Sequence, residues 1–226
     1  EVGGPYEPYF QSQRLGVYKK YALELVEKGH ALELVEKGHA YYCFCDEERL
    51  ESVRNSQKEK GQITKYDKFC LHLSEEDIKE NLAKGKPYVI RLKVPQDIDI
   101  EFEDEILGKL SFPSNDIDDQ VLIKSDGFPT YHLAVVVDDH LMEITHVLRG
   151  REWLPSTPKH ILLYDFFGWE KPKFIHLPLL RETDSTKKLS KRTGSVSASG
   201  FLEEGYLPEA MLNFMMFLGW NPGTER

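Results

Sequence analysis

The sequence lacks several features that would place it in a specialised class of protein. No apolar run approaches the roughly 18 to 20 residues that span a bilayer, and the first residues show no basic region followed by an apolar stretch. Three cysteines among 226 residues are too few for the disulfide framework of a small secreted domain. We therefore expect a cytoplasmic protein that does not interact with membranes.

The chain also lacks a general excess of positive charge. Its formal net charge of −9 argues against a cationic coat for nucleic acid. Residues 97–105 hold six acids and no base, and we interpret them as a solvated face kept away from phosphates. The opposite balance occurs over residues 171–192, which could meet phosphates because they carry seven basic side chains: Lys171, Lys173, Arg181, Lys187, Lys188, Lys191 and Arg192.

An exact repeat interrupts the N-terminal part, where the nine residues 22–30 recur as 31–39. Two copies of nine residues are too few and too short for a solenoid, so a recent duplication or an artefact of the sequence remains open. Apolar residues at helical spacing predict a helix over 11–28. Caps at Asp46 and Ser74 predict two further short helices, and alternation predicts strands over 88–94, 106–112 and 120–124.

The pattern changes after residue 127. The valine-rich run 133–137 predicts a buried parallel strand, followed by a loop that carries His146 and Arg149. A helix is expected to open at Thr157 and Pro158, and residues 174–177 predict another strand. Strand, helix and strand form one unit of a doubly wound nucleotide-binding sheet, so the sequence indicates the α/β class. A last helix is expected over 208–218.

The three cysteines and one histidine form two closely spaced pairs. Cys43 and Cys45 are separated by one residue, as are Cys70 and His72, and 24 residues lie between the pairs. On an extended strand or in a tight turn, each pair projects to one side of the backbone. Three thiolates and one imidazole suit tetrahedral Zn²⁺, so we predict a structural zinc site. The alternative is a small core that contains reduced thiols.

A basic pentapeptide, Lys188-Leu189-Ser190-Lys191-Arg192, follows the predicted strand 174–177 and its loop. Two lysines three residues apart can neutralise the charge that develops on a triphosphate as pyrophosphate leaves. The segment resembles the Lys-Met-Ser-Lys-Ser motif of class I aminoacyl-tRNA synthetases. By that resemblance Lys188 and Lys191 are catalytic, and Lys191 contacts the ATP phosphates. A solvated lysine-rich loop is the alternative.

The resemblance to bacterial-type glutamyl-tRNA synthetases covers residues 2 to about 223 and includes 129–132, 135–140, 144–150 and 156–158. It implies that Tyr131 and Arg149 hold the substrate glutamate, which suits a forked guanidinium and a hydroxyl on a carboxylate. It further implies that Glu152, Trp153 and Leu180 flank the adenosine pocket, although core packing is an alternative for Trp153. Some relatives carry asparagine where this chain has Val135.

The resemblance implies half of a Rossmann-type catalytic domain with inserted and appended parts. We expect an acceptor-stem-binding α+β insertion with the zinc site over 1–127, the catalytic half over 128–180, and the motif loop with a short helical module over 181–226. The family's His-Ile-Gly-His segment and anticodon-binding helices do not occur in the sequence. The fragment alone should therefore not activate glutamate.

The expected function is glutamate–tRNA ligation by a monomeric enzyme, with ATP and Mg²⁺, L-glutamate and tRNA(Glu) as cofactors and partners. Two alternatives remain at this point. One is the shorter paralogue that loads glutamate onto a modified base of tRNA(Asp), which lacks an anticodon domain. The other is a non-catalytic, zinc-dependent RNA-binding module, which would bind tRNA without any affinity for ATP.

Overall fold

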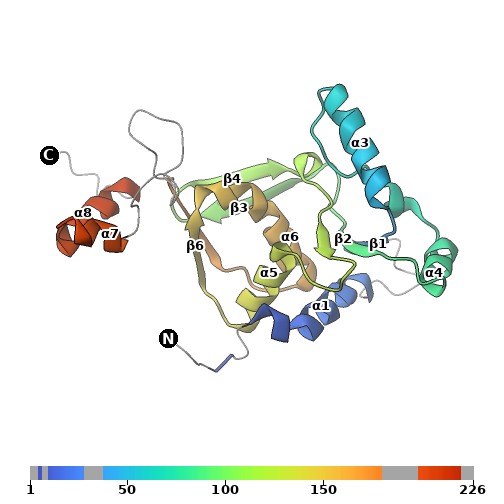
Figure 1. Ribbon diagram of the computed structural model, residues 1–226, viewed down its shortest axis with the longest axis horizontal. Helices are drawn as coiled ribbons and strands as arrows, with labels where there is room; N and C mark the ends of the chain where they lie inside the picture. Colours follow the sequence, from blue (N-terminus) through green and yellow to red (C-terminus); the bar gives the residue numbers. More distant parts are fainter. Residues whose placement is uncertain (1–4, 7–9, 28–37, 180–197, 220–226) are drawn as a thin grey trace. The chain divides into compact units, whose positions relative to one another are not determined.

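A computed structural model describes residues 5–6, 10–27, 38–179 and 198–219 of the chain (Figure 1). The chain divides into two compact units. The first comprises residues 1–102, 109–145 and 156–172, and the second comprises 103–108, 146–155 and 173–226. Among the described residues, no helix has both the length and the apolar character that a membrane span requires. The three-part division at residues 127 and 180 stays a prediction.

A three-stranded antiparallel sheet in the first unit has the order β1-β2-β5. Its strands are β1 (Ala40–Cys43), β2 (Val89–Leu92) and β5 (Val121–Ile123). The register aligns Cys43 with Val89 and Ala40 with Leu92, so the last residue of β1 carries the first cysteine. This sheet therefore supplies a fixed platform for one side of the predicted metal site.

Two helices with well-defined caps lie between β1 and β2 in the sequence. Helix α3 (Glu47–Glu59) begins where the Asp46 carboxylate accepts a hydrogen bond from the Arg49 amide. Helix α4 (Glu75–Ala83) begins with a reciprocal capping box between Ser74 and Asp77. These side chains satisfy amides that have no partner inside a helix, which confirms both predicted starts.

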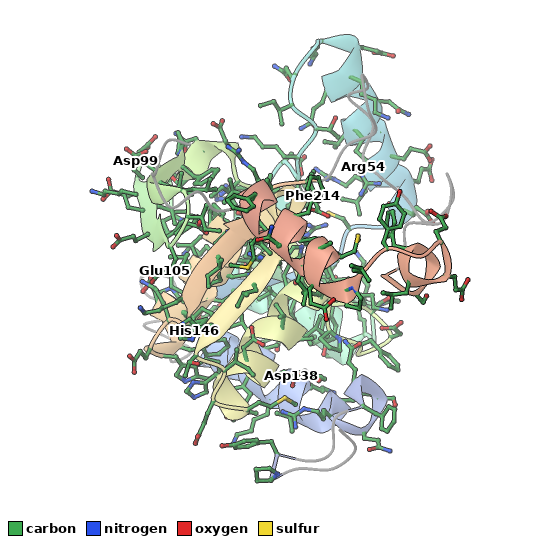
Figure 2. The ribbon with its side chains drawn as sticks, turned by 90° about the vertical axis from the view of Figure 1, so that its left-hand side faces the viewer. Arg54, Asp99, Glu105, Asp138, His146 and Phe214 are labelled. Atoms are coloured by element: carbon green, nitrogen blue, oxygen red, sulfur yellow. The ribbon has the colours of Figure 1, made fainter. Side chains whose placement is uncertain are left out.

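Three packed helices form the other part of the first unit: α1 (Leu15–Glu27), α5 (Tyr131–Leu141) and α6 (Thr157–Phe167) (Figure 1). Asp138 of α5, labelled in Figure 2, accepts hydrogen bonds from Arg14, at 2.7 Å, and from Tyr18 of α1, also at 2.7 Å. Gly168 ends α6 with a φ of 70°, a left-handed conformation that glycine adopts without strain. The predicted helix start at Thr157 is confirmed.

The prediction of a strand over residues 133–137 is wrong, because these residues lie within α5. Leu133, Ala134, Val136 and Val137 are all buried, at the three- and four-residue spacings of a helix that packs on two neighbours. Valine has only a modest intrinsic preference against helix, and tertiary burial overrides it here. The predicted loop around Arg149 is wrong as well, since it is strand β6 (His146–Gly150).

A second, four-stranded sheet has the order β4-β3-β7-β6. Its strands are β3 (Asp99–Asp104), β4 (Gly108–Pro113), β6 and β7 (Lys173–Leu177). Strands β6 and β7 pair in parallel, and α6 lies between them in sequence. The α/β class is thus confirmed, with His146–Gly150 as the first strand of the strand–helix–strand unit.

Short elements complete the described chain. They are the 3-10 helices η1 (Gln11–Gln13), η2 (Phe69–His72), η3 (Ser114–Asp116) and η4 (Arg151–Ser156), and the α-helices α7 (Ala198–Glu203) and α8 (Pro208–Gly219). The last of these confirms the helix predicted over 208–218. Helix α1 ends at Glu27, so most of the duplicated segment lies outside the described residues.

Candidate functional site

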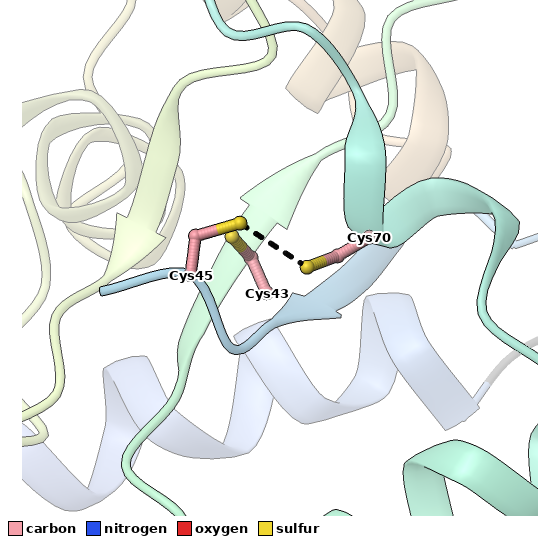
Figure 3. Close-up of side chains that lie close together, drawn as sticks. All are labelled: Cys43, Cys45 and Cys70. Atoms are coloured by element: carbon pink, nitrogen blue, oxygen red, sulfur yellow. Dashed lines mark hydrogen bonds between the residues drawn. The ribbon is translucent and has the colours of Figure 1, made fainter. Parts of the chain in front are cut away.

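Three cysteine sulfurs converge in the first unit (Figure 3). Cys43 ends β1, Cys45 follows two residues later, and Cys70 lies in η2. All three sulfurs lie within 4.8 Å of one another, and Cys45 Sγ is 3.5 Å from Cys70 Sγ. Tetrahedral zinc with bonds of about 2.3 Å would separate its sulfur ligands by roughly 3.8 Å. The donor set and its spacing therefore fit Zn²⁺.

The group of potential ligands that the described residues form around these sulfurs does not include His72. Cys70 and His72 lie on the 3-10 helix η2, where residues two apart point in directions about 120° apart. The prediction that Cys70 and His72 project to the same side is therefore wrong. The Tyr66 hydroxyl lies at the sulfurs instead, 3.3 Å from Cys43 Sγ and 3.3 Å from Cys45 Sγ.

Sequence reasoning missed Tyr66, because a tyrosine four residues before a cysteine forms no familiar metal-binding pattern. Its hydroxyl accepts a hydrogen bond from the Cys70 amide at 3.0 Å, which fixes it beside the sulfurs. Its ring is covered by the Arg91 guanidinium, 3.9 Å from the ring centroid. These contacts fix the hydroxyl beside the sulfurs of Cys43 and Cys45.

Positive charge surrounds the cysteines. Arg49 Nη1 lies 3.6 Å from Cys45 Sγ, and the same guanidinium pairs with Asp67 at 2.6 Å. A hydrogen bond from Cys70 lowers the pKa of Cys43, assisted by Tyr66 and Arg91 and opposed by burial. A lowered pKa favours the thiolate, which is the form that ligates metal.

Tyr131 begins α5 and is 42% exposed. The ring meets those of His132 and His160 edge-on, with centroids 5.5 and 5.9 Å away. His132 Nδ1 and His160 Nε2 are 3.0 Å apart, and His160 is buried on α6. Tyr131 is thus an exposed aromatic residue that packs against two histidines.

Arg149 lies on β6 in the second unit and donates a hydrogen bond from Nε to His176 Nε2 at 3.0 Å. His176 is fully buried, and its Nδ1 lies 2.7 Å from Asp104 Oδ2. Arg149 is near the carboxyl end of a parallel strand, where open α/β sheets bind their ligands.

Glu152 and Trp153 follow on η4 in the same unit. A side chain at Gly150 would overlap the Glu152 carboxylate, so a glycine is required for Glu152 to adopt its position. Trp153 is 40% exposed, which argues against plain core packing. Tyr131 belongs to the first unit, and the remaining predicted residues, Leu180, Lys188 and Lys191, lie outside the described residues.

Two curated proteins with similar sequences are named as glutamate–tRNA ligases. A glutamate–tRNA ligase of Alkaliphilus metalliredigens is 53% identical over 219 residues, 97% of this chain and 42% of that protein. A glutamate–tRNA ligase of Clostridioides difficile is 51% identical over the same shares of both chains. The chain thus spans less than half the length of these relatives.

A solved structure agrees with the sequence comparison. The crystal structure of a glutamate tRNA ligase from Elizabethkingia meningosepticum in complex with its amino acid superposes with a TM-score of 0.81 at 40% identity, over 98% of this chain and 47% of the other. The catalytic domain of tRNA synthetases class I (E and Q) matches residues 2–226. The chain therefore belongs to the class I tRNA synthetases for E and Q, within their catalytic domain.

Proposed function

We propose that the protein containing this chain is a glutamate–tRNA ligase. It activates L-glutamate with ATP to glutamyl-adenylate and transfers the glutamyl group to the 3′ end of tRNA(Glu). The observation that carries this proposal is the identity of 53% to a glutamate–tRNA ligase over 97% of the chain. That name also favours the ligase over the tRNA(Asp)-modifying paralogue and over a non-catalytic RNA-binding module.

Activation joins a glutamate carboxylate oxygen to the α-phosphorus of ATP and releases pyrophosphate. Arg149 and Tyr131 would hold glutamate, since a guanidinium and a phenol hydroxyl together donate several hydrogen bonds to carboxylates. Glu152, Trp153 and Leu180 would flank the adenosine. Lys188 and Lys191 would neutralise charge on the leaving pyrophosphate. Mg²⁺, when bound with ATP, supplies further charge neutralisation at the phosphates.

We also propose a structural zinc ion in the first unit, held by Cys43, Cys45 and Cys70. The Tyr66 hydroxyl is better placed than His72 as the fourth ligand, because it already lies 3.3 Å from two of the sulfurs. The ion would cross-link the end of β1 to η2 and stiffen a part of the chain that we propose contacts the tRNA acceptor stem.

Metal analysis of Tyr66→Phe and His72→Ala proteins distinguishes the two candidates for the fourth ligand. We expect the Tyr66→Phe protein to lose zinc to a chelator faster than the His72→Ala protein does. Faster loss of zinc from the His72→Ala protein would instead identify His72 as the fourth ligand. The monomeric state and the cytoplasmic location stay predictions from the sequence.

Pyrophosphate exchange in the full-length protein tests the ligase proposal. Radiolabelled pyrophosphate should enter ATP when L-glutamate and tRNA(Glu) are both present, and L-glutamine or L-aspartate should not replace L-glutamate. Arg149→Ala should abolish the glutamate dependence, whereas Lys79→Ala, on the exposed α4, serves as the control and should retain it. A folded full-length protein without glutamate-dependent exchange would reject the proposal.

A further inference from the structure

An acid occupies a core position in strand β3. Exposed and buried residues alternate along this strand, and the inward positions are Ile100, Phe102 and Asp104. Asp104 is 1% exposed, so the solvated face expected for the acidic run does not hold at this residue. Burial of a carboxylate costs free energy unless the group is fully hydrogen-bonded. The hydrogen-bond partners of Asp104 therefore indicate what its side chain holds in place.

The sheet register places three polar side chains on one face of neighbouring strands. Arg149 of β6 is aligned with His176 of β7, and Asp104 of β3 is aligned with Phe174, two residues before His176. Aligned residues of parallel strands share a face, as do residues two apart on one strand. Asp104, His176 and Arg149 therefore lie in a row across β3, β7 and β6.

The contacts along this row fix the tautomer of His176. The Asp104 carboxylate accepts hydrogen bonds from the amides of Ile106 and Leu107 at one oxygen, and from the His176 amide at the other. His176 Nδ1 lies 2.7 Å from this second oxygen. A carboxylate only accepts, so Nδ1 carries the proton, and Nε2 is the acceptor that Arg149 Nε reaches at 3.0 Å.

This arrangement restricts how Arg149 can bind a carboxylate. A guanidinium forks either side-on, through Nε and one Nη, or end-on, through both Nη atoms. A side-on fork would require the bond from Nε to His176 to break, whereas the end-on fork leaves that bond intact. The ring of Phe174, with its centroid 5.7 Å from the guanidinium carbon, further restricts the plane of the group.

We infer that Asp104 and His176 are positioning residues that orient Arg149 for end-on binding of the glutamate substrate. The inference rests on the proposed function, because it assumes that Arg149 holds glutamate. Neither residue touches the substrate in this account. Their effect is to hold the guanidinium in one orientation before glutamate arrives, so that binding costs little side-chain entropy.

Two isosteric replacements of His176 separate positioning from a purely structural role. Glutamine can place an amide oxygen near the Nε2 position and still accept from Arg149, but it loses the bond to Asp104. Asparagine can donate to Asp104 from the Nδ1 position but does not reach Arg149. If His176 has only a structural role, the asparagine variant should have the smaller increase in KM for glutamate. If His176 positions Arg149, the glutamine variant should have the smaller increase.

The experiment measures glutamate-dependent pyrophosphate exchange, with tRNA(Glu) present, by full-length His176→Asn, His176→Gln and wild-type proteins. We expect His176→Asn to raise KM for glutamate about 10-fold or more, the factor that corresponds to about 1.4 kcal/mol, and His176→Gln to raise it less. KM for ATP should stay within about twofold for both variants, since loss of one guanidinium contact acts on glutamate alone. His140→Asn, which removes a histidine stacked on Trp169 in the first unit, is the matched control.

The outcomes separate the inference from the proposed function. An active wild type whose His176→Gln variant has a glutamate KM equal to or above that of His176→Asn would overturn the positioning role and leave the ligase intact. Equal increases in KM for glutamate and ATP would overturn it as well. A folded wild type without glutamate-dependent exchange would refute the ligase and this inference together.

Discussion

Replacement of Asp104 by asparagine should destabilise the second unit, because no orientation of the amide satisfies the donors around it. Each carboxylate oxygen accepts two hydrogen bonds, from Ile106 and Leu107 on one side and from two nitrogens of His176 on the other. The amide nitrogen must face one of these pairs. A change of tautomer at His176 can recover one bond, so at least one buried donor stays unpaired.

The expected loss follows from that count. One unpaired buried donor costs about 1 to 3 kcal/mol, and we expect the free energy of unfolding to fall by that amount at neutral pH. The assay is urea unfolding of wild-type, Asp104→Asn and Asp99→Asn proteins. Asp99 is exposed on the same strand (Figure 2), so its variant should stay within about 0.5 kcal/mol of wild type.

The dependence on pH supplies a second readout. Burial raises the pKa of Asp104, but hydrogen bonds from His176, Leu107 and Ile106 outweigh burial, and the net pKa is lowered. The stability that the carboxylate contributes is therefore complete above the ordinary aspartate pKa of about 3.9. It is lost as the pH falls through the lowered folded value. The gap between wild type and Asp104→Asn should shrink in acid, and an unchanged or widening gap would refute the reasoning.

Three further predictions concern the other parts of the structure. Purified protein should contain about one zinc per chain, and Cys45→Ser should lower both the zinc content and the unfolding midpoint; zinc-free protein of unchanged stability would contradict the site. Gly150→Ala should displace the Glu152 carboxylate and raise KM for ATP in pyrophosphate exchange, and an unaltered KM would separate Glu152 from the adenosine pocket. Leu133→Ala should lower the free energy of unfolding by about 2 to 5 kcal/mol, because Leu133 is fully buried in α5, and a smaller loss in urea unfolding would show that the helix packs loosely.

The caps and the cysteine spacing made parts of the structure predictable. Asp46 and Ser74 begin α3 and α4 through local hydrogen bonds, and local chemistry can be inferred from neighbouring residues alone. Cys43, Cys45 and Cys70 were likewise predicted from spacing and do converge. The position of Tyr66 was not predictable, since its hydroxyl lies 3.3 Å from the Cys43 and Cys45 sulfurs through tertiary contacts and not through a spacing rule.

The errors arose where tertiary packing decides. Val136 and Val137 favour a strand locally, but burial between two helices makes them part of α5. The acidic run 97–105 predicts a solvated Asp104, but the alternation along β3 places its side chain on the buried face. An acid in phase with Ile100 and Phe102 is the signal that could have revealed it, because inward positions of a strand are otherwise apolar.

A crystal structure of the full-length protein with bound L-glutamate tests the central claim most directly. The account predicts that both Nη atoms of Arg149 contact one glutamate carboxylate at about 2.8 Å, while Nε still donates to His176. The account would be contradicted by glutamate bound away from Arg149. It would also be contradicted by glutamate hydrogen-bonded to Arg149 Nε with the bond from Nε to His176 broken.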